Sequence, residues 1–163
     1  MSANERILLR HTLATLAYRA AKVLRGAPAD FSAFTPIPGG RSAGQILAHL
    51  GDLMDWAASI VEGKQTWHDS AVQAWDADVQ RFFAATARFD ALLAGSRENA
   101  PGLREGTDEK LFQGPIADAL THVGQLAMMR RAAGAPVKGE NYFVADIKAG
   151  RVGQEQAPPK REF

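Results

Sequence analysis

The residues of this sequence best suited to chemistry are two histidines and one aspartate. His49 and His122 each lie on the inward side of an expected helix, among apolar neighbours. Asp118 comes four residues before His122, so these two side chains share one helical face. Two packed helices can direct all three side chains at one point, and two imidazoles with a carboxylate suffice for an open divalent-metal site. The sequence therefore predicts a metal site at His49, Asp118 and His122, with water in the open positions.

Each of these residues also has a structural interpretation. An inward histidine is commonly a core residue with satisfied hydrogen bonds, although histidine is also the commonest metal ligand. Asp118 is expected in the first turn of a helix that opens at Pro115, where the helix dipole favours a carboxylate. The sequence leaves both interpretations open. The other histidines, His11 and His68, are interpreted as ordinary surface or boundary residues.

Three further polar side chains are candidates to hydrogen-bond the metal ligands and hold them in orientation. Asp52 lies one helical turn after His49 and is expected to orient its ring. Gln125 and Arg130 follow on the later helix and are expected to do the same there. The tryptophans are interpreted as core or end packing, but Trp56 lies two turns after His49 and can also line a pocket.

The segment Gly39-Gly40-Arg41-Ser42 before a helix resembles an anion-binding helix start. No strand precedes it, and the Lys-Ser/Thr ending of a phosphate loop is absent. A capped helix after a glycine-rich turn is the preferred interpretation, and this capping role also explains Ser42 without nucleophilic chemistry.

Four segments with helical periodicity must position these side chains. Ser2 with Glu5, and Ser42 with Gln45, have capping-box spacing at two of the expected helix starts. No segment alternates with the period of a strand, so no sheet is expected. The sequence predicts an all-α four-helix bundle within residues 1–137, followed by an irregular tail over residues 138–163. The expected helices cover, roughly, residues 3–24, 43–62, 70–94 and 115–134.

Apolar residues outside these segments are expected to close the bundle. Phe31, Phe34 and Ile37 are predicted to plug one end of it. In the tail, Tyr142, Phe143 and Ile147 are expected to pack on the bundle. The last seven residues, rich in proline and charge, are expected to be mobile.

Composition narrows the function classes. The chain has 163 residues, 46% hydrophobic and 23% charged, as in one ordinary globular domain. A net charge of +1 gives no field for nucleic acid, so a nucleic-acid partner is not expected. The absence of cysteine excludes thiolate ligands and cysteine nucleophiles. No membrane association and a cytoplasmic location are expected, because neither a signal peptide nor a long apolar run is seen.

Two stretches of the sequence resemble DinB-like proteins, the damage-inducible metal-binding four-helix bundles. They are SAGQILAHL at residues 42–50 and DALTHVGQ at residues 118–125, supported by the Arg pair at 130–131 and by GAPV at 134–137. The resemblance covers the four-helix part. It implies a fold similar to that of a mycothiol-dependent isomerase and of bacillithiol transferases.

The resemblance also implies a ligand set of three histidines, one on the second helix and two on the fourth. His49 and His122 match the first and the last of these, and Asp118 stands at the middle position. A carboxylate there remains compatible with Zn or Ni. The family fold further implies a long crossover between the second and third helices. The short predicted gap means either that one helix is shorter than expected or that the two are antiparallel.

Two functions follow as hypotheses. One is a metal-dependent thiol transferase or hydrolase with a small-molecule substrate, for which a low-molecular-weight thiol is the expected cofactor of the transferase. The other is a non-catalytic metal-binding or small-molecule-binding protein of the stress response. A homodimer is expected in either case. The third helix has more aromatic residues than its packing face within one bundle needs, and the resemblance also implies a dimer.

Overall fold

The computed structural model describes residues 2–95 and 100–163, and within them the fold is all-α. The described residues contain no strand, only an isolated bridge between Glu140 and Glu162. The prediction of an all-α fold is confirmed. The helices are α1 (Ala3–Leu24), α2 (Ala43–Val61), α3 (Trp75–Ala94), α4 (Thr107–Leu111) and α5 (Ala117–Ala132), with short 3-10 turns at Phe31–Ala33 and Tyr142–Val144.

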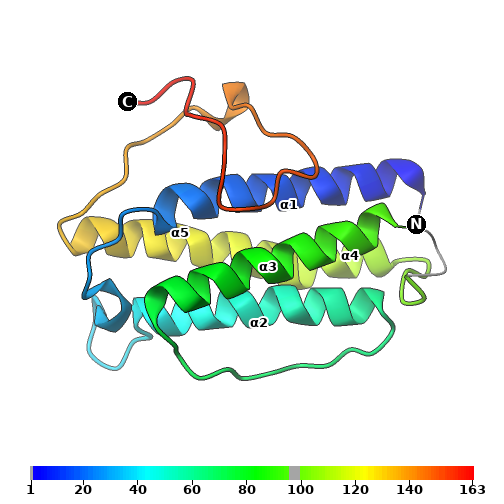
Figure 1. Cartoon of the computed structure of the whole chain (residues 1–163), viewed down its shortest axis with the longest axis horizontal. Helices are drawn as coiled ribbons and strands as arrows, with labels where there is room; N and C mark the ends of the chain where they lie inside the picture. Colours follow the sequence, from blue (N-terminus) through cyan, green and yellow to red (C-terminus); the bar gives the residue numbers. More distant parts are fainter. Residues whose placement is uncertain (1, 96–99) are drawn as a thin grey trace.

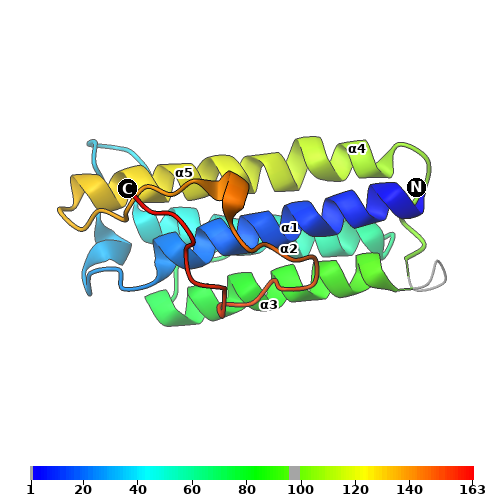
Figure 2. The same ribbon diagram turned by 90° about the horizontal axis from the view of Figure 1, so that it is seen from above.

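The long helices lie side by side, and Figures 1 and 2 show their directions. α1 runs opposite to α2 and α3, while α5 runs in the same direction as α1. α2 and α3 are therefore parallel, and residues 62–74 return along the length of α2 to connect them (Figure 1). This is the long crossover that the resemblance implies.

The start of α3 differs from the prediction and explains how the crossover is possible. The helix begins at Trp75, and residues 70–74 belong to the crossover instead. The backbone N–H and the hydroxyl of Ser70 both donate to the carboxylate of Asp52 on α2. Val72 lies so close to α2 that a Cβ on Gly44 would meet its side chain at 2.9 Å. These tertiary contacts hold residues 70–74 in the crossover, although the sequence predicts a helix that begins at residue 70.

The fourth helical segment is longer than predicted. It begins at Thr107 and continues from α4 through a π-helical turn, Phe112–Ile116, into α5. The N–H of Ala117 donates to the carbonyl of Phe112, five residues earlier. Pro115, the expected first residue of this helix, lies inside the π turn. A widened turn tolerates a residue that lacks an N–H and crowds the preceding turn.

Asp118 lies in the first turn of α5, as the sequence predicts. This helix continues from α4 and the π turn, so its first turn is not a free helix end. The helix dipole acts mainly within the first and last turns of a helix. The structural interpretation of Asp118 and its interpretation as a metal ligand therefore both stay open at this point.

The core follows the predicted stripes. Both capping boxes form as expected, at Ser2 and at Ser42. In α3 the aromatic side chains Phe82, Phe83 and Phe89 are all buried within the chain. The aromatic side chains that suggested a dimer surface on this helix thus pack inside the bundle of a single chain. The largest fully buried side chains include Leu13, Leu16, Leu47, Leu50, Phe82, Phe89, Leu111, Ile116 and Leu126.

The plug at the end of the bundle is only partly as predicted. Phe31 is buried and Phe34 packs on the core, with the two rings stacked 6.1 Å apart. Ile37 is 62% exposed, so its assignment to the plug is wrong. The reason is local, because Ile37 opens a tight turn at the surface in which the N–H of Gly40 donates to its carbonyl.

The tail crosses over α1 (Figures 1 and 2) and is tied to it by a buried carboxylate. Glu140 accepts from the Tyr18 hydroxyl at 2.6 Å and from Lys22 at 2.8 Å. Burial, together with this hydrogen bond to Glu140, raises the pKa of Tyr18. The last residues, expected to be mobile, return to the same place, since Glu162 also accepts from Lys22.

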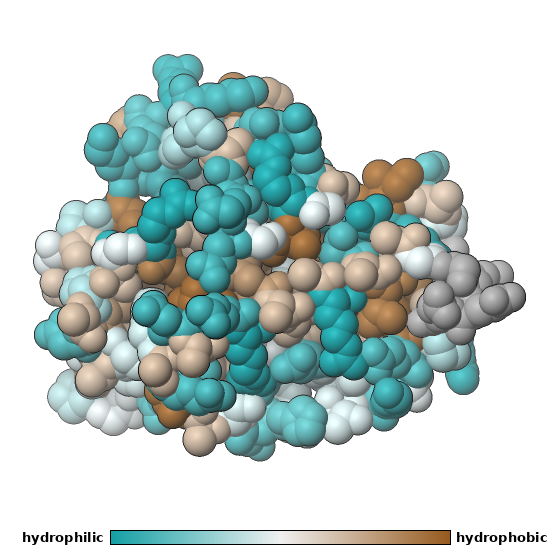
Figure 3. All heavy atoms as spheres, viewed as in Figure 1, coloured by the Kyte–Doolittle hydropathy of each residue, from teal (hydrophilic) through white to brown (hydrophobic). Residues whose placement is uncertain are grey.

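The apolar residues of the tail behave differently from one another. Tyr142 meets Tyr18 edge to face and Ile147 packs on the core, as expected. Phe143 is 96% exposed, so the prediction that it packs on the bundle is wrong. The surface formed by the tail is mostly hydrophilic (Figure 3). None of the described helices is long and apolar enough to cross a membrane.

Candidate metal centre

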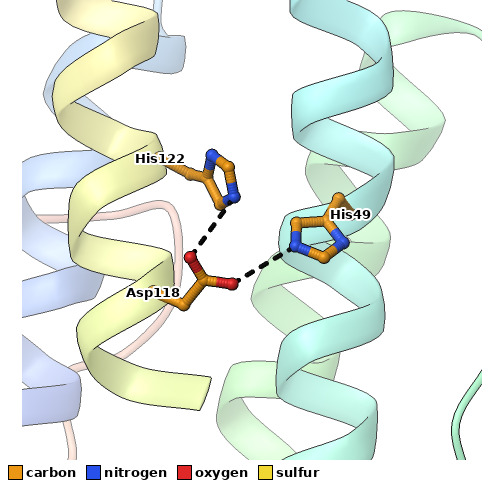
Figure 4. Close-up of side chains that lie close together, drawn as sticks. All are labelled: His49, Asp118 and His122. Atoms are coloured by element: carbon orange, nitrogen blue, oxygen red, sulfur yellow. Dashed lines mark hydrogen bonds and ion pairs between the residues drawn. The ribbon is translucent and has the colours of Figure 1, made fainter. Parts of the chain in front are cut away.

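The three predicted ligands come together between two helices. His49 lies in the first half of α2, and Asp118 and His122 lie one turn apart on α5 (Figure 4). The side chains of His49 and His122 are 19% and 12% exposed, while that of Asp118 is 46% exposed. Both imidazoles are thus largely shielded by the bundle, and the carboxylate faces the open side.

The geometry places the carboxylate between the two rings. His49 Nε2 lies 3.4 Å from Asp118 Oδ2, and His122 Nε2 lies 3.4 Å from Asp118 Oδ1 (Figure 4). The two ring centroids are 4.9 Å apart. One donor atom from each residue can be chosen so that all three lie within 4.8 Å of one another. This group can hold a metal ion.

These distances are compatible with a shared ion. A charge-assisted N–H···O bond is normally about 2.7–2.9 Å long, so both contacts are long for such a bond, although the one from His49 still has the geometry of a hydrogen bond. Metal bonds of about 2.1 Å at tetrahedral angles place neighbouring ligand atoms about 3.4 Å apart. Each histidine nitrogen lies at that distance from one oxygen of Asp118, and the oxygen is a different one in each case.

The hydrogen bond behind His122 fixes which nitrogen faces the site. His122 Nδ1 lies 2.8 Å from Oε1 of Gln125 and donates to it. In the neutral ring Nε2 then carries a lone pair, and this lone pair points at the Asp118 carboxylate. Two acceptors that face each other require a cation between them, either a metal ion or a second proton on the ring. Gln125 thus makes the contact with His122 that the predicted supporting role requires.

Asp52 does not take the predicted role beside His49. Its two oxygens accept from Ser70, as described above, and from the guanidinium of Arg81. Burial disfavours its charged form, but the hydrogen bonds from Ser70 and Arg81 hold its pKa below the usual range. Helical spacing alone placed Asp52 near His49, whereas the crossover and α3 supply its actual partners.

Arg130 also has a different role from the predicted one. Its guanidinium donates to the carbonyls of Val23, Arg25 and Gly26 at the end of α1, and to that of Ala135. These are carbonyls that a helix end and the following turn leave without partners. Burial lowers the pKa of Arg130. The residue joins the ends of α1 and α5 and is not part of the metal centre.

The sequence did not identify Trp67 as a site residue. This side chain comes from the crossover and meets the His49 ring edge to face, with centroids 5.6 Å apart. It also meets Trp56 at 5.7 Å, so two indoles form a wall beside the histidine. The only feature of the sequence that marked Trp67 was that it is an aromatic residue among polar neighbours. Its place beside His49 depends on the path of the crossover, which local patterns do not reveal.

Two hollows flank the centre and give it access to solvent. The hollow beside His49 has a volume of about 350 Å³, and the one beside His122 has a volume of about 410 Å³. Arg41 lines both of them. Each hollow thus exposes one of the two histidines to solvent.

Comparisons with known proteins add no family. No protein-family model matches the chain, and no significant match was found among curated proteins or solved structures. The likeness to DinB-like proteins therefore stays a prediction that rests on residues 42–50 and 118–125.

Proposed function

We propose that the protein is a DinB-like metal-binding bundle that holds one divalent ion, Zn or Ni, between His49, Asp118 and His122. The observation that carries the proposal is the convergence of two imidazole nitrogens on one carboxylate at 3.4 Å, longer than a typical charge-assisted hydrogen bond. Borderline divalent ions accept this mixed nitrogen and oxygen set.

The site supports transfer or hydrolysis of a small molecule better than a purely structural ion. Structural zinc sites are usually closed by four protein ligands, and this group offers three. A divalent ion bound here supplies Lewis acidity and lowers the pKa of a bound water or thiol. The chain itself holds the His122 tautomer through Gln125 and shields His49 with Trp67. With no cysteine in the chain, a thiol must come from a cofactor or substrate.

Metal content is the direct test. The chain, purified without an affinity tag or added metal and then titrated with zinc, should bind about one ion per molecule. His49→Ala should lose most of this binding with its helix content intact, and Asp118→Ala should weaken it less. His11→Ala, a change at an exposed histidine outside the site, is the matched control. Zinc affinity should fall as the pH drops below about 6.5, where free imidazole becomes protonated.

Other outcomes separate the alternatives. If His49→Ala binds zinc as tightly as the wild type, the proposal fails. In the alternative, a second proton on the His122 ring faces Asp118, and nitrogen NMR of the metal-free protein would then show both ring nitrogens of His122 protonated. Stoichiometric zinc without hydrolase or thiol-transferase activity would favour the non-catalytic binding protein. We also propose that the protein is cytoplasmic, as expected from the sequence.

A further inference from the structure

An arginine, Arg41, lies beside the candidate metal centre. Several other arginines are engaged, for example Arg10 with Asp90 and Arg81 with Asp52. Arg41 is exposed and, within residues 2–95 and 100–163, forms no ion pair or side-chain hydrogen bond. It nevertheless lies on the wall of both hollows beside the candidate centre. A cation in this position is available to a ligand.

The hollow beside His122 is otherwise largely apolar. Its walls include Pro36, Ile46 and Met129, and at its rim Ile37 and Met128 are 62% and 59% exposed. Large apolar side chains left in contact with water at the edge of a concave site are typical of ligand pockets. Methionine adapts its shape to an apolar ligand more readily than a branched side chain does.

A turn holds this rim in place before any ligand binds. Pro38 and Gly39 occupy its centre, and Gly39 has a φ of +75°, which glycine adopts without strain. The N–H of Gly40 closes the turn on the carbonyl of Ile37 at 3.1 Å. A Cβ on Gly40 would lie 2.8 Å from the Ile37 side chain, so only glycine leaves this side chain in place. Ile37 and Arg41 are thus presented by a fixed loop.

The charges around the two hollows differ. The hollow beside His49 is lined by the carboxylates of Asp52 and Asp69, which oppose an anion. Among the described residues that line the hollow beside His122, none is acidic, and Arg41 carries the only permanent charge. An anionic ligand is therefore favoured on the His122 side.

We infer that the hollow beside His122 binds a small organic anion with an apolar body, such as an aliphatic carboxylate. The carboxylate pairs with Arg41, and the chain lies against Ile46, Met128 and Met129. The far end then approaches His122. That this ligand is also the substrate rests on the proposed function, but its binding to the hollow does not.

Methionine-methyl NMR on the metal-free protein tests the binding. Hexanoate should shift the Met128 and Met129 methyl signals saturably, and hexan-1-ol, of equal length but uncharged, should bind about fivefold more weakly. Arg41→Gln should reduce hexanoate binding to the level of the alcohol. Arg104→Gln, at an exposed arginine that lines another hollow, is the matched control and should leave hexanoate binding unchanged.

Several results would overturn the inference. They are equal binding of hexanoate and the alcohol, no effect of Arg41→Gln, or no saturable shift of the two methionine signals. His49→Ala should still bind hexanoate, because this residue lies outside the hollow. If zinc fails to bind but hexanoate binds in an Arg41-dependent way, the proposed function is wrong and the present inference stands.

Discussion

At the scale of the residue, metal binding at the proposed centre should depend on the hydrogen bond between His122 and Gln125. Gln125 fixes the tautomer that leaves Nε2 free, and partners of this kind typically contribute tenfold or more to metal affinity. We predict that Gln125→Ala weakens zinc binding about tenfold. Competition with a chromophoric chelator measures the change. Gln113→Ala, at an exposed position on the same continuous helical segment, serves as control, and equal affinities for the two variants would contradict the prediction.

Asp52 belongs to the same scale, but its effect is on stability. Its usual pKa is 3.8, and the folded protein holds the pKa lower through Ser70 and Arg81. A depressed pKa contributes stability that is fully present above pH 3.8 and is lost as the pH falls through the folded-state value. We predict that Asp52→Asn lowers the free energy of unfolding by about 2 kcal/mol at pH 7. The difference from the wild type should shrink below pH 3.8.

Urea unfolding at several pH values measures this difference. Asp69→Asn is the control, because within the described part of the chain Asp69 accepts a hydrogen bond only from the exposed indole of Trp67. Its effect should stay within about 0.5 kcal/mol at all pH values. A loss in Asp52→Asn that is the same at pH 7 and at pH 3 would show that the charge of Asp52 is not its cause.

At the scale of the element, two glycines of this chain have opposite structural roles. Gly102 donates its N–H to Val61 at the end of α2, and a Cβ there would overlap the carbonyl of Ile60. Gly124 lies within α5 and a Cβ there would meet nothing within 4 Å. We predict that Gly102→Ala destabilises the protein by about 2 kcal/mol or more through backbone displacement.

The matched change has the opposite sign. Gly124→Ala should stabilise the protein by roughly 0.5–1 kcal/mol, because alanine in a helix interior loses less conformational entropy than glycine. Thermal unfolding of the two variants beside the wild type measures both effects. Destabilisation by Gly124→Ala, or tolerance of Gly102→Ala, would contradict the placement of these glycines.

At the scale of the whole molecule, the expected homodimer needs a surface other than α3. The buried rings of that helix are unavailable, whereas Ile7 and Leu8 on α1 and Phe112 on the π turn are 61%, 66% and 50% exposed. The resemblance still implies a dimer, and we predict a mass near twice 17.6 kDa in solution. Light scattering at micromolar concentration decides this, and a mass of one chain would exclude the dimer.

Much of this molecule follows from local sequence patterns. Capping boxes and apolar periodicity fix where α1 and α2 begin and which faces they bury, because both act over one or two turns. The pairing of Asp118 with His122 follows from helical spacing alone, whichever residue starts the helix. The inward direction of His49 follows from its apolar neighbours in the same way.

Only the tertiary structure determined the remaining features. Residues 70–74 are held in the crossover because Ser70 bonds to Asp52 across the bundle, and Pro115 is accommodated by a π turn within a longer helix. Asp52 and Arg130 bind partners that no helical spacing reveals, and Trp67 reaches His49 through the path of a loop. These features depend on contacts between residues that are distant in the chain. Where such contacts bury polar groups together with their partners, packing between helices and loops overrides the local preference of the sequence for one secondary structure.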